Sequence, residues 1–110
     1  MAQVKETEAM IQAACLAYLA RKRYFFFRLN NLPVSEIRDG KRMFRKMGEY
    51  TPKGLPDCIV VKEGSFIGLE FKGKGKDLSV EQMEIFRRII LAGGQCHLIR
   101  SIDDLQAIGL

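Results

Sequence analysis

The feature that most constrains this chain is a pair of apolar segments separated by two residues that favour a tight turn. Residues 57–62 and 66–72 have the character of strands, and Glu63-Gly64 lies between them as a two-residue hairpin turn. Because the length of the turn fixes which residues face each other, the register of this hairpin follows from local sequence. Counting outward from the turn, Asp57 faces Glu70.

Two carboxylates on facing strands are the first chemical signal in the chain. Directly opposite residues on paired strands have Cβ atoms roughly 5 Å apart, so we expect Asp57 and Glu70 to meet on one face of the sheet. At an effective dielectric constant of about 20, their repulsion is on the order of 3 kcal/mol. A bound divalent cation converts this repulsion into attraction, and the pair therefore indicates a metal site.

Alternation along the second strand adds a cation to the same face. The alternating side chains are Ile67, Leu69 and Phe71 on the apolar face, and Gly68, Glu70 and Lys72 on the other. We expect Lys72 to stand beside the carboxylates and Gly68 to leave space next to them. Carboxylates suit Mg²⁺, a metal activates water, and a lysine orients that water or stabilises the transition state, as phosphodiester hydrolysis requires. The alternative is that Glu70 and Lys72 are ordinary surface residues of a half-exposed strand.

Helix and strand patterns surround this hairpin. Helices are expected at 8–21, from Ser79 to Gly93-Gly94 and from Ser101 to about 108, with further strands at 24–29 and 95–100. Residues 32–56 have no clean period and are expected to form a long loop with a short helix near 41–46. The order predicts one α/β domain over 1–110, with helices on the faces of a mixed sheet and a right-handed parallel crossover before the last strand.

The formal net charge of +5 is concentrated in one segment. Residues 38–53 net +4, and their cations are Arg38, Lys41, Arg42, Arg45, Lys46 and Lys53. Such a run is either a solvated face or a surface that binds phosphates. A second basic stretch, Lys74-Gly75-Lys76, is expected to form an exposed loop.

Cysteine spacing and hydropathy exclude several classes of protein. The three cysteines, Cys15, Cys58 and Cys96, form no CxxC pair and lie in apolar segments, so we expect buried free thiols without a zinc site or disulfide framework. No apolar run approaches the roughly 18 residues of a membrane span, and the N-terminus does not have the pattern of a secretory signal. We therefore place the protein in the cytoplasm and expect no membrane partner.

Several motifs together resemble those of a known nuclease family. Gly54-Leu55-Pro56-Asp57 followed by Glu70-Phe71-Lys72 is similar to the signature of the PD-(D/E)XK nuclease superfamily. The narrower resemblance is to the VRR-NUC family, and it is carried by the segments 8–12, 53–57, 66–72, 78–82, 93–94 and 101–105. It covers nearly the whole chain except the loop 32–53. It implies a restriction-endonuclease-like core of order αβββαβ within a single VRR-NUC-like domain.

The resemblance implies a role for each residue of the motif. Asp57 and Glu70 would ligate Mg²⁺ or Mn²⁺ together with the backbone carbonyl of Phe71, and Lys72 would be the catalytic lysine.

Two further polar residues take roles from the same resemblance. Glu8 would supply an acidic group from the first helix, either to a metal directly or through water. Gln82 would help to orient Lys72 or the substrate. Each has a structural alternative, because Glu8 also complements a helix dipole and Gln82 also completes a capping box with Ser79.

The resemblance to stand-alone members of the family implies that this chain is a bacterial or phage enzyme. It would then act in a bacterial cell or in a phage-infected host. The same resemblance implies a homodimer that acts on branched DNA, including four-way junctions. A two-fold dimer offers two equivalent cutting sites to such a substrate. The aromatic run 24–27 is a candidate for the dimer interface, the alternative being burial in a central strand. The basic segment 38–53 and Lys74 and Lys76 would hold the DNA backbone, with little dependence on sequence.

The function expected from these residues is a metal-dependent, structure-selective deoxyribonuclease resembling a Holliday junction resolvase. The nearest alternative is a less selective nickase or restriction-type nuclease. A DNA-binding module without catalytic activity, and a basic interaction protein whose charges serve only solubility, are alternatives from other classes.

Overall fold

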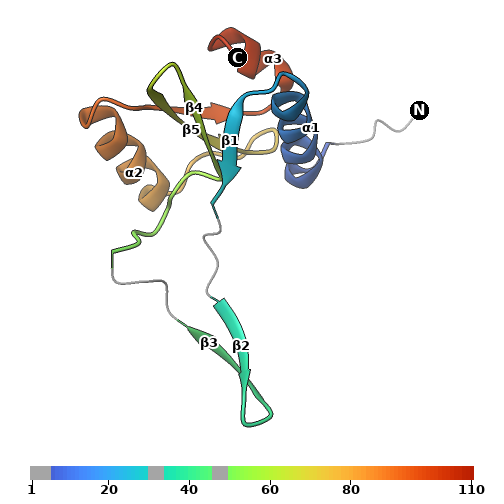
Figure 1. Cartoon of the computed structure of the whole chain (residues 1–110), viewed down its shortest axis with the longest axis vertical. Helices are drawn as coiled ribbons and strands as arrows, with labels where there is room; N and C mark the ends of the chain where they lie inside the picture. The colour runs from blue at the N-terminus through green and yellow to red at the C-terminus, as the bar shows by residue number, and fades with distance from the viewer. Residues whose placement is uncertain (1–5, 30–33, 46–49) are drawn as a thin grey trace.

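Helices and strands alternate along the chain in the computed structural model, which describes residues 6–29, 34–45 and 50–110. The elements are α1 (Glu8–Arg21), β1 (Phe25–Arg28), β2 (Val34–Arg38), β3 (Lys41–Arg45), β4 (Cys58–Lys62), β5 (Ser65–Phe71), α2 (Val80–Leu91), β6 (Gln95–Ile99) and α3 (Ile102–Ala107) (Figure 1). Outside the segment 34–45, every element lies where the sequence pattern predicts it.

The β4–β5 hairpin has the register that its turn predicts. Lys62 pairs with Ser65, and the antiparallel ladder continues to Cys58 opposite Leu69. Glu63 and Gly64 both have positive φ, at 51° and 79°, as the two central residues of a type I′ turn require. The next step beyond the ladder brings Asp57 and Glu70 level with each other.

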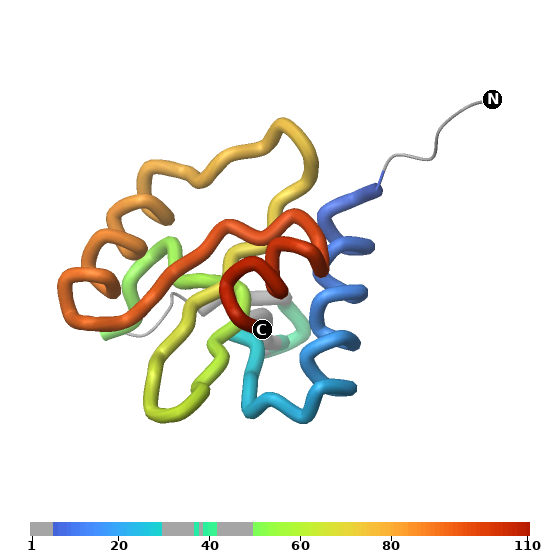
Figure 2. The backbone as a smooth tube through the Cα atoms, turned by 90° about the horizontal axis from the view of Figure 1, so that it is seen from above, coloured from blue at the N-terminus to red at the C-terminus, as the bar shows by residue number. Residues whose placement is uncertain are grey.

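A four-stranded mixed sheet forms the centre of the fold, in the order β1-β4-β5-β6. β1 pairs antiparallel with β4, and β5 pairs parallel with β6 after the crossover through α2. α1 and α2 lie on opposite sides of the sheet (Figure 2). The mixed α/β architecture with flanking helices is therefore confirmed.

The main hydrophobic core lies between the sheet and the pair α1 and α3. Its fully buried members include Cys15 and Leu19 of α1, Leu69 and Phe71 of β5, and Leu105 of α3. The opposite face of the sheet, which α2 covers, has fewer buried apolar side chains, among them Ile59 and Ile85. The two faces thus differ in character, and the residues of the candidate site belong to the second one.

The segment 34–45 departs from expectation. It forms a separate two-stranded antiparallel hairpin, β2–β3, that extends away from the four-stranded sheet (Figure 1). The short helix expected near 41–46 is wrong, because Lys41–Arg45 is a strand. The signal for this hairpin is Asp39-Gly40, whose positive φ angles of 50° and 76° again suit a two-residue turn.

The cysteines are buried free thiols, as the sequence predicts. Cys15, Cys58 and Cys96 are free and buried, and burial raises the pKa of the Cys58 thiol to about 12, which keeps it protonated and unreactive at neutral pH. None of the helices in the described part of the chain combines the length and the apolar character that crossing a bilayer requires.

Gly68 has a packing role that differs from the expected one. A Cβ at this position would lie 2.8 Å from Cys96 Sγ and 2.9 Å from Pro56 Cγ. The missing side chain does not open space beside the carboxylates; it lets Pro56 pack directly on β5. Because Pro56 precedes Asp57, this close approach helps to set the position of the first carboxylate.

We therefore predict that Gly68→Ala lowers the free energy of unfolding by about 1–3 kcal/mol, because the new methyl group overpacks the contact with Pro56. Gly73→Ala is the matched control, since its Cβ would meet nothing closer than 3.9 Å. Thermal denaturation of both variants measures the difference. Equal melting temperatures for the two variants would contradict this packing role.

Candidate functional site

Asp57 immediately precedes β4, and contacts on both of its sides hold it. Its Oδ2 accepts a hydrogen bond of 2.9 Å from the backbone N–H of Phe71 in β5. Its backbone carbonyl accepts one of 2.9 Å from the N–H of Leu29, just after β1. The carboxylate is therefore fixed beside the last residue of β5, on the face of the sheet that α2 covers.

Glu70 is the one charged side chain that the described residues bury, with only 4% of its surface exposed. Its Oε1 accepts a hydrogen bond of 2.8 Å from Gln82 Nε2 of α2. Its Oε2 is buried and has no hydrogen-bond partner within the described part of the chain. A buried carboxylate oxygen is costly unless a proton shared with Asp57 or a bound cation neutralises it, so this atom is where a cation would bind.

The electrostatics of Glu70 reflect both burial and the neighbouring carboxylate. Burial raises the pKa of Glu70 to about 8, and the negative charge of Asp57 acts in the same direction, whereas the Lys72 ammonium acts in the opposite one. The Asp57 carboxylate expected from the hairpin register is thus close enough to act on Glu70. At neutral pH and without a cation, Glu70 is largely protonated.

Gln82 performs two functions with one amide group. Its side-chain Oε1 accepts a hydrogen bond of 2.8 Å from the Ser79 backbone N–H. The backbone N–H of Gln82 donates to Ser79 Oγ at 3.1 Å, and the two bonds together complete the predicted capping box. Its Nε2 is then directed at Glu70. Gln82 therefore positions the Glu70 carboxylate from the first turn of α2, and it contacts Glu70 where the family resemblance suggested Lys72.

Lys72 directly follows the last residue of β5 and is half-buried. Its backbone N–H donates to the carbonyl of Ile99 at 3.2 Å, so β6 holds the backbone from which the side chain extends. Since its charge lowers the pKa of Glu70, the ammonium lies near the carboxylate pair, as the alternation along β5 predicts.

Two pockets divide the predicted residues between them. The pocket over the carboxylate pair, of about 310 Å³, is lined by Lys53, Gly54, Leu55, Asp57, Glu70, Ser79, Glu81 and Gln82. The second, of about 540 Å³, is lined by Glu6, Thr7, Glu8, Lys72, Gly73, Lys74, Lys76 and Asp77. Lys72 lines the second pocket, and its charge lowers the pKa of Glu70, which lines the first.

Glu8 does not join the carboxylate pair as a third acidic group. It is exposed at the start of α1 and lines the pocket that contains Lys72. Residues 6–29, 34–45 and 50–110 contain no group of three or more His, Cys, Asp or Glu side chains that could hold a metal ion. The expectation that Glu8 is a direct third ligand is therefore not supported, and its place in the first turn of α1 fits the dipole alternative.

Gly54 positions the loop before Asp57, a role that its place in the motif Gly54-Leu55-Pro56-Asp57 does not by itself predict. Its φ of +91° is a conformation that glycine adopts readily. A Cβ here would lie 2.7 Å from the backbone of Glu81 and 2.9 Å from the Gln82 nitrogen. The loop before Asp57 therefore packs directly against the first turn of α2, which brings Asp57 and Gln82 to the same pocket.

Arg100 was not singled out from sequence, yet it holds the basic loop after β5. Its guanidinium donates to the Gly73 carbonyl and forms an ion pair of 3.4 Å with Asp77, while its backbone N–H donates to Asp104 at 2.8 Å. The loop that presents the exposed Lys74 and Lys76 is thereby tied to the end of β6. An arginine after a strand has no local signal for this role, because its partners lie 23 and 27 residues earlier.

The predicted DNA-binding cations occupy three places. Arg38, Lys41, Arg42 and Arg45 belong to the β2–β3 hairpin, Lys53 lines the carboxylate pocket, and Lys74 and Lys76 line the neighbouring one. Lys46 lies outside the described residues. The basic segment is therefore not one continuous loop beside the site.

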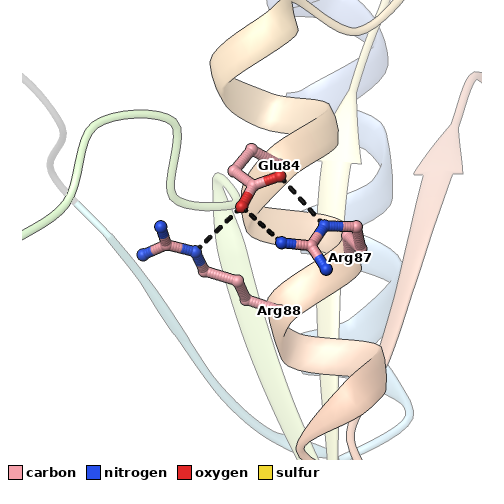
Figure 3. Close-up of polar contacts among 3 residues, drawn as sticks. All are labelled: Glu84, Arg87 and Arg88. Atoms are coloured by element: carbon pink, nitrogen blue, oxygen red, sulfur yellow. Dashed lines mark hydrogen bonds and ion pairs between the residues drawn. The ribbon is translucent and has the colours of Figure 1, made fainter.

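Two further arginines on the outer face of α2 are neutralised in part. Arg87 and Arg88 both contact the Glu84 carboxylate, at 2.7 and 3.1 Å (Figure 3). The two arginines lower the pKa of Glu84 to about 2 through their hydrogen bonds. This exposed cluster joins successive turns of α2 and lies apart from the carboxylate pocket.

Comparison with known proteins identifies no relative: no family model, no curated protein and no solved structure matches this chain. Its function must therefore be inferred from the residues that the fold brings together.

The raised pKa of Glu70 predicts how stability depends on pH without divalent cations. The unfolded carboxyl has a pKa near 4.5 and the folded one near 8, so its contribution to stability is complete below about pH 4.5 and is lost as pH rises through 8. We predict a melting temperature that falls over this range in the chelator-treated protein. Glu70→Gln removes this dependence, because the amide does not titrate, and Glu84→Gln, at an exposed carboxylate, is the control. A wild-type slope in Glu70→Gln would contradict the assignment.

Proposed function

We propose that this chain is a Mg²⁺- or Mn²⁺-dependent endonuclease that hydrolyses DNA phosphodiester bonds, with a preference for branched DNA such as four-way junctions. The observation that carries the proposal is the pair Asp57 and Glu70, brought together over one pocket with a half-buried lysine beside them. The resemblance of the motifs around these residues supports the same reaction class.

The residues present fit a divalent cation. Glu70 Oε2 is buried without a donor, and a cation at this atom would satisfy it and neutralise the repulsion from Asp57. Asp57 and Glu70 would hold the ion, with the Phe71 carbonyl as a further ligand, and waters would complete a shell of the kind that Mg²⁺ retains. When bound, such a cation supplies Lewis acidity and a more acidic water.

The chain's own groups supply the rest of the chemistry. The Phe71 N–H keeps Asp57 in place, and the Gln82 amide directs one oxygen of Glu70 toward α2, which leaves the other oxygen for a ligand. The Lys72 ammonium, whose charge already acts on Glu70, would stabilise the charge that develops on the phosphate oxygens. Because Lys72 is half-buried, this interaction is stronger than it would be in bulk water.

The substrate class follows from the distribution of charge. Basic residues belong to two separate elements, the β2–β3 hairpin and the loop after β5, and phosphate contacts from separate elements suit a branched duplex. The proposal includes a homodimer, whose two-fold symmetry would match that of a four-way junction, and a cytoplasmic location.

The decisive test is cleavage of labelled four-way junction, flap and plain duplex DNA with and without Mg²⁺ or Mn²⁺. Asp57→Asn is expected to reduce the cleavage rate by roughly two orders of magnitude or more while DNA binding persists, because one metal ligand is lost and the fold is kept. Asp103→Asn, at an exposed position of α3, is the control. Metal-dependent cleavage by Asp57→Asn at the wild-type rate would refute the proposed site, and equal rates on all three substrates would favour a less selective nuclease.

Salt dependence tests whether the β2–β3 hairpin binds DNA. Each phosphate contact contributes roughly 0.9 to the slope of log affinity against log salt concentration, so replacing both Arg42 and Arg45 by alanine should reduce that slope by about 2. The matched control replaces Arg87 and Arg88, which already contact Glu84. If the slope of the hairpin variant equals that of wild type, the hairpin does not contact phosphates.

A further inference from the structure

An exposed group of apolar side chains lies at the β1 side of the sheet. Phe25 and Phe27 of β1 are 67% and 41% exposed, and Phe66 of β5 and Val61 of β4 are about as accessible as Phe27. The rings of Phe25 and Phe27 lie 6.0 Å apart. We call these four residues the aromatic surface. Burial in a central strand, the alternative considered for the run 24–27, is wrong for Phe25 and Phe27, because β1 is an edge strand.

The aromatic surface and the carboxylate pair share one face of the sheet. Phe26 packs on the opposite side against the main core, so Phe25 and Phe27 face the side that α2 only partly covers. The register defines three successive rows across the sheet: Phe25, Val61 and Phe66; then Phe27, Ile59 and Gly68; then the level of Asp57 and Glu70. Each row is about 7 Å from the next, a step that one extended nucleotide can span.

The charge around β1 favours a polyanion. Between Glu8 and Glu36 the sequence contains no acidic residue, and the cations in that interval are Arg21, Lys22, Arg23 and Arg28. All four are exposed; Arg21, Lys22 and Arg23 precede β1, and Arg28 ends it on the face of Phe26. Exposed aromatic rings flanked by cations are the combination that binds single-stranded nucleic acid, because bases stack on the rings while cations hold the phosphates.

Building on the proposed nuclease function, we propose that the aromatic surface binds a single-stranded segment of the DNA substrate and leads it along β1 toward Asp57 and Glu70. The bases stack on Phe25 and Phe27, and the backbone continues over the next row to the carboxylate pocket. The register that places the aromatic surface on the face of the carboxylates, and the lack of acidic residues between Glu8 and Glu36, favour a nucleic acid over a second copy of this chain. The substrate class is then DNA with an unpaired strand at its branch.

Binding of a fluorescently labelled oligothymidylate to the full chain in EDTA tests this without any cleavage. Replacing both Phe25 and Phe27 by leucine should weaken binding roughly tenfold or more, because leucine keeps an apolar surface but cannot stack. Leu91→Ala, which alters an apolar side chain that is 73% exposed on α2, should leave the affinity unchanged. Because the replaced rings are exposed, the variants are expected to melt near the wild-type temperature.

The absence of tryptophan from the chain provides a direct probe of stacking. Phe25→Trp should retain the affinity for oligothymidylate, and its fluorescence should be quenched by the stacked bases. Unchanged affinity in the double leucine variant, or unquenched tryptophan, would overturn the proposal. If the leucine variant instead turns a dimer into a monomer by sedimentation and keeps its DNA affinity, the surface is an interface between copies. Metal-dependent cleavage is scored separately, so binding without cleavage would refute only the proposed nuclease.

Discussion

The close approach of two carboxylates is the constraint on which the rest of this structure depends. The two-residue turn of the β4–β5 hairpin sets Asp57 level with Glu70, and the local backbone has no freedom to separate them. The fold tolerates the repulsion because burial and the neighbouring charge raise the pKa of Glu70 to about 8, so the carboxyl is neutral in the absence of a cation. Under the proposed function, a proton and a divalent cation would compete for this carboxyl.

Contacts from neighbouring residues hold Asp57 and Glu70 in position. Pro56 packs on Gly68, and Gly54 packs on the backbone at the start of α2, so the loop before Asp57 is fixed to both layers of the fold. Gln82 joins the cap of α2 to Glu70 with the two ends of one amide. A change at any of these four positions would move a carboxylate even though none of the four residues bears a charge.

Sequence reasoning succeeded where the determining interactions are local. The hairpin register, the capping box and the bounds of the helices depend on residues a few positions apart, and they were predicted to within one or two residues. Asp39-Gly40 has the same kind of local turn signal, but the surrounding basic residues lack the apolar alternation that marks a strand, and the hairpin was missed.

The errors concern features that depend on the order of the strands or on distant contacts. Phe25 and Phe27 resemble residues of a central strand, and only the position of β1 at the edge of the sheet exposes them. Arg100 reaches Gly73 and Asp77 because the parallel pairing of β5 and β6 brings their ends together. Glu8 lines the pocket that contains Lys72 and not the one over the carboxylates, so its role toward a metal, directly or through water, stays a prediction.

The unequal covering of the two faces of the sheet connects stability with the proposed chemistry. α1 and α3 enclose the main core on one face, so that face supplies most of the apolar burial that holds the chain folded. α2 covers the other face over β6 and leaves β1 open, which allows polar and aromatic residues there to serve binding without weakening the core. A chain of 110 residues forms only one core, so the proposed binding residues must lie on the face that this core does not use. The carboxylates lie between the covered and the open parts of that face: Gln82 can hold them from α2, and a strand crossing β1 can still reach them.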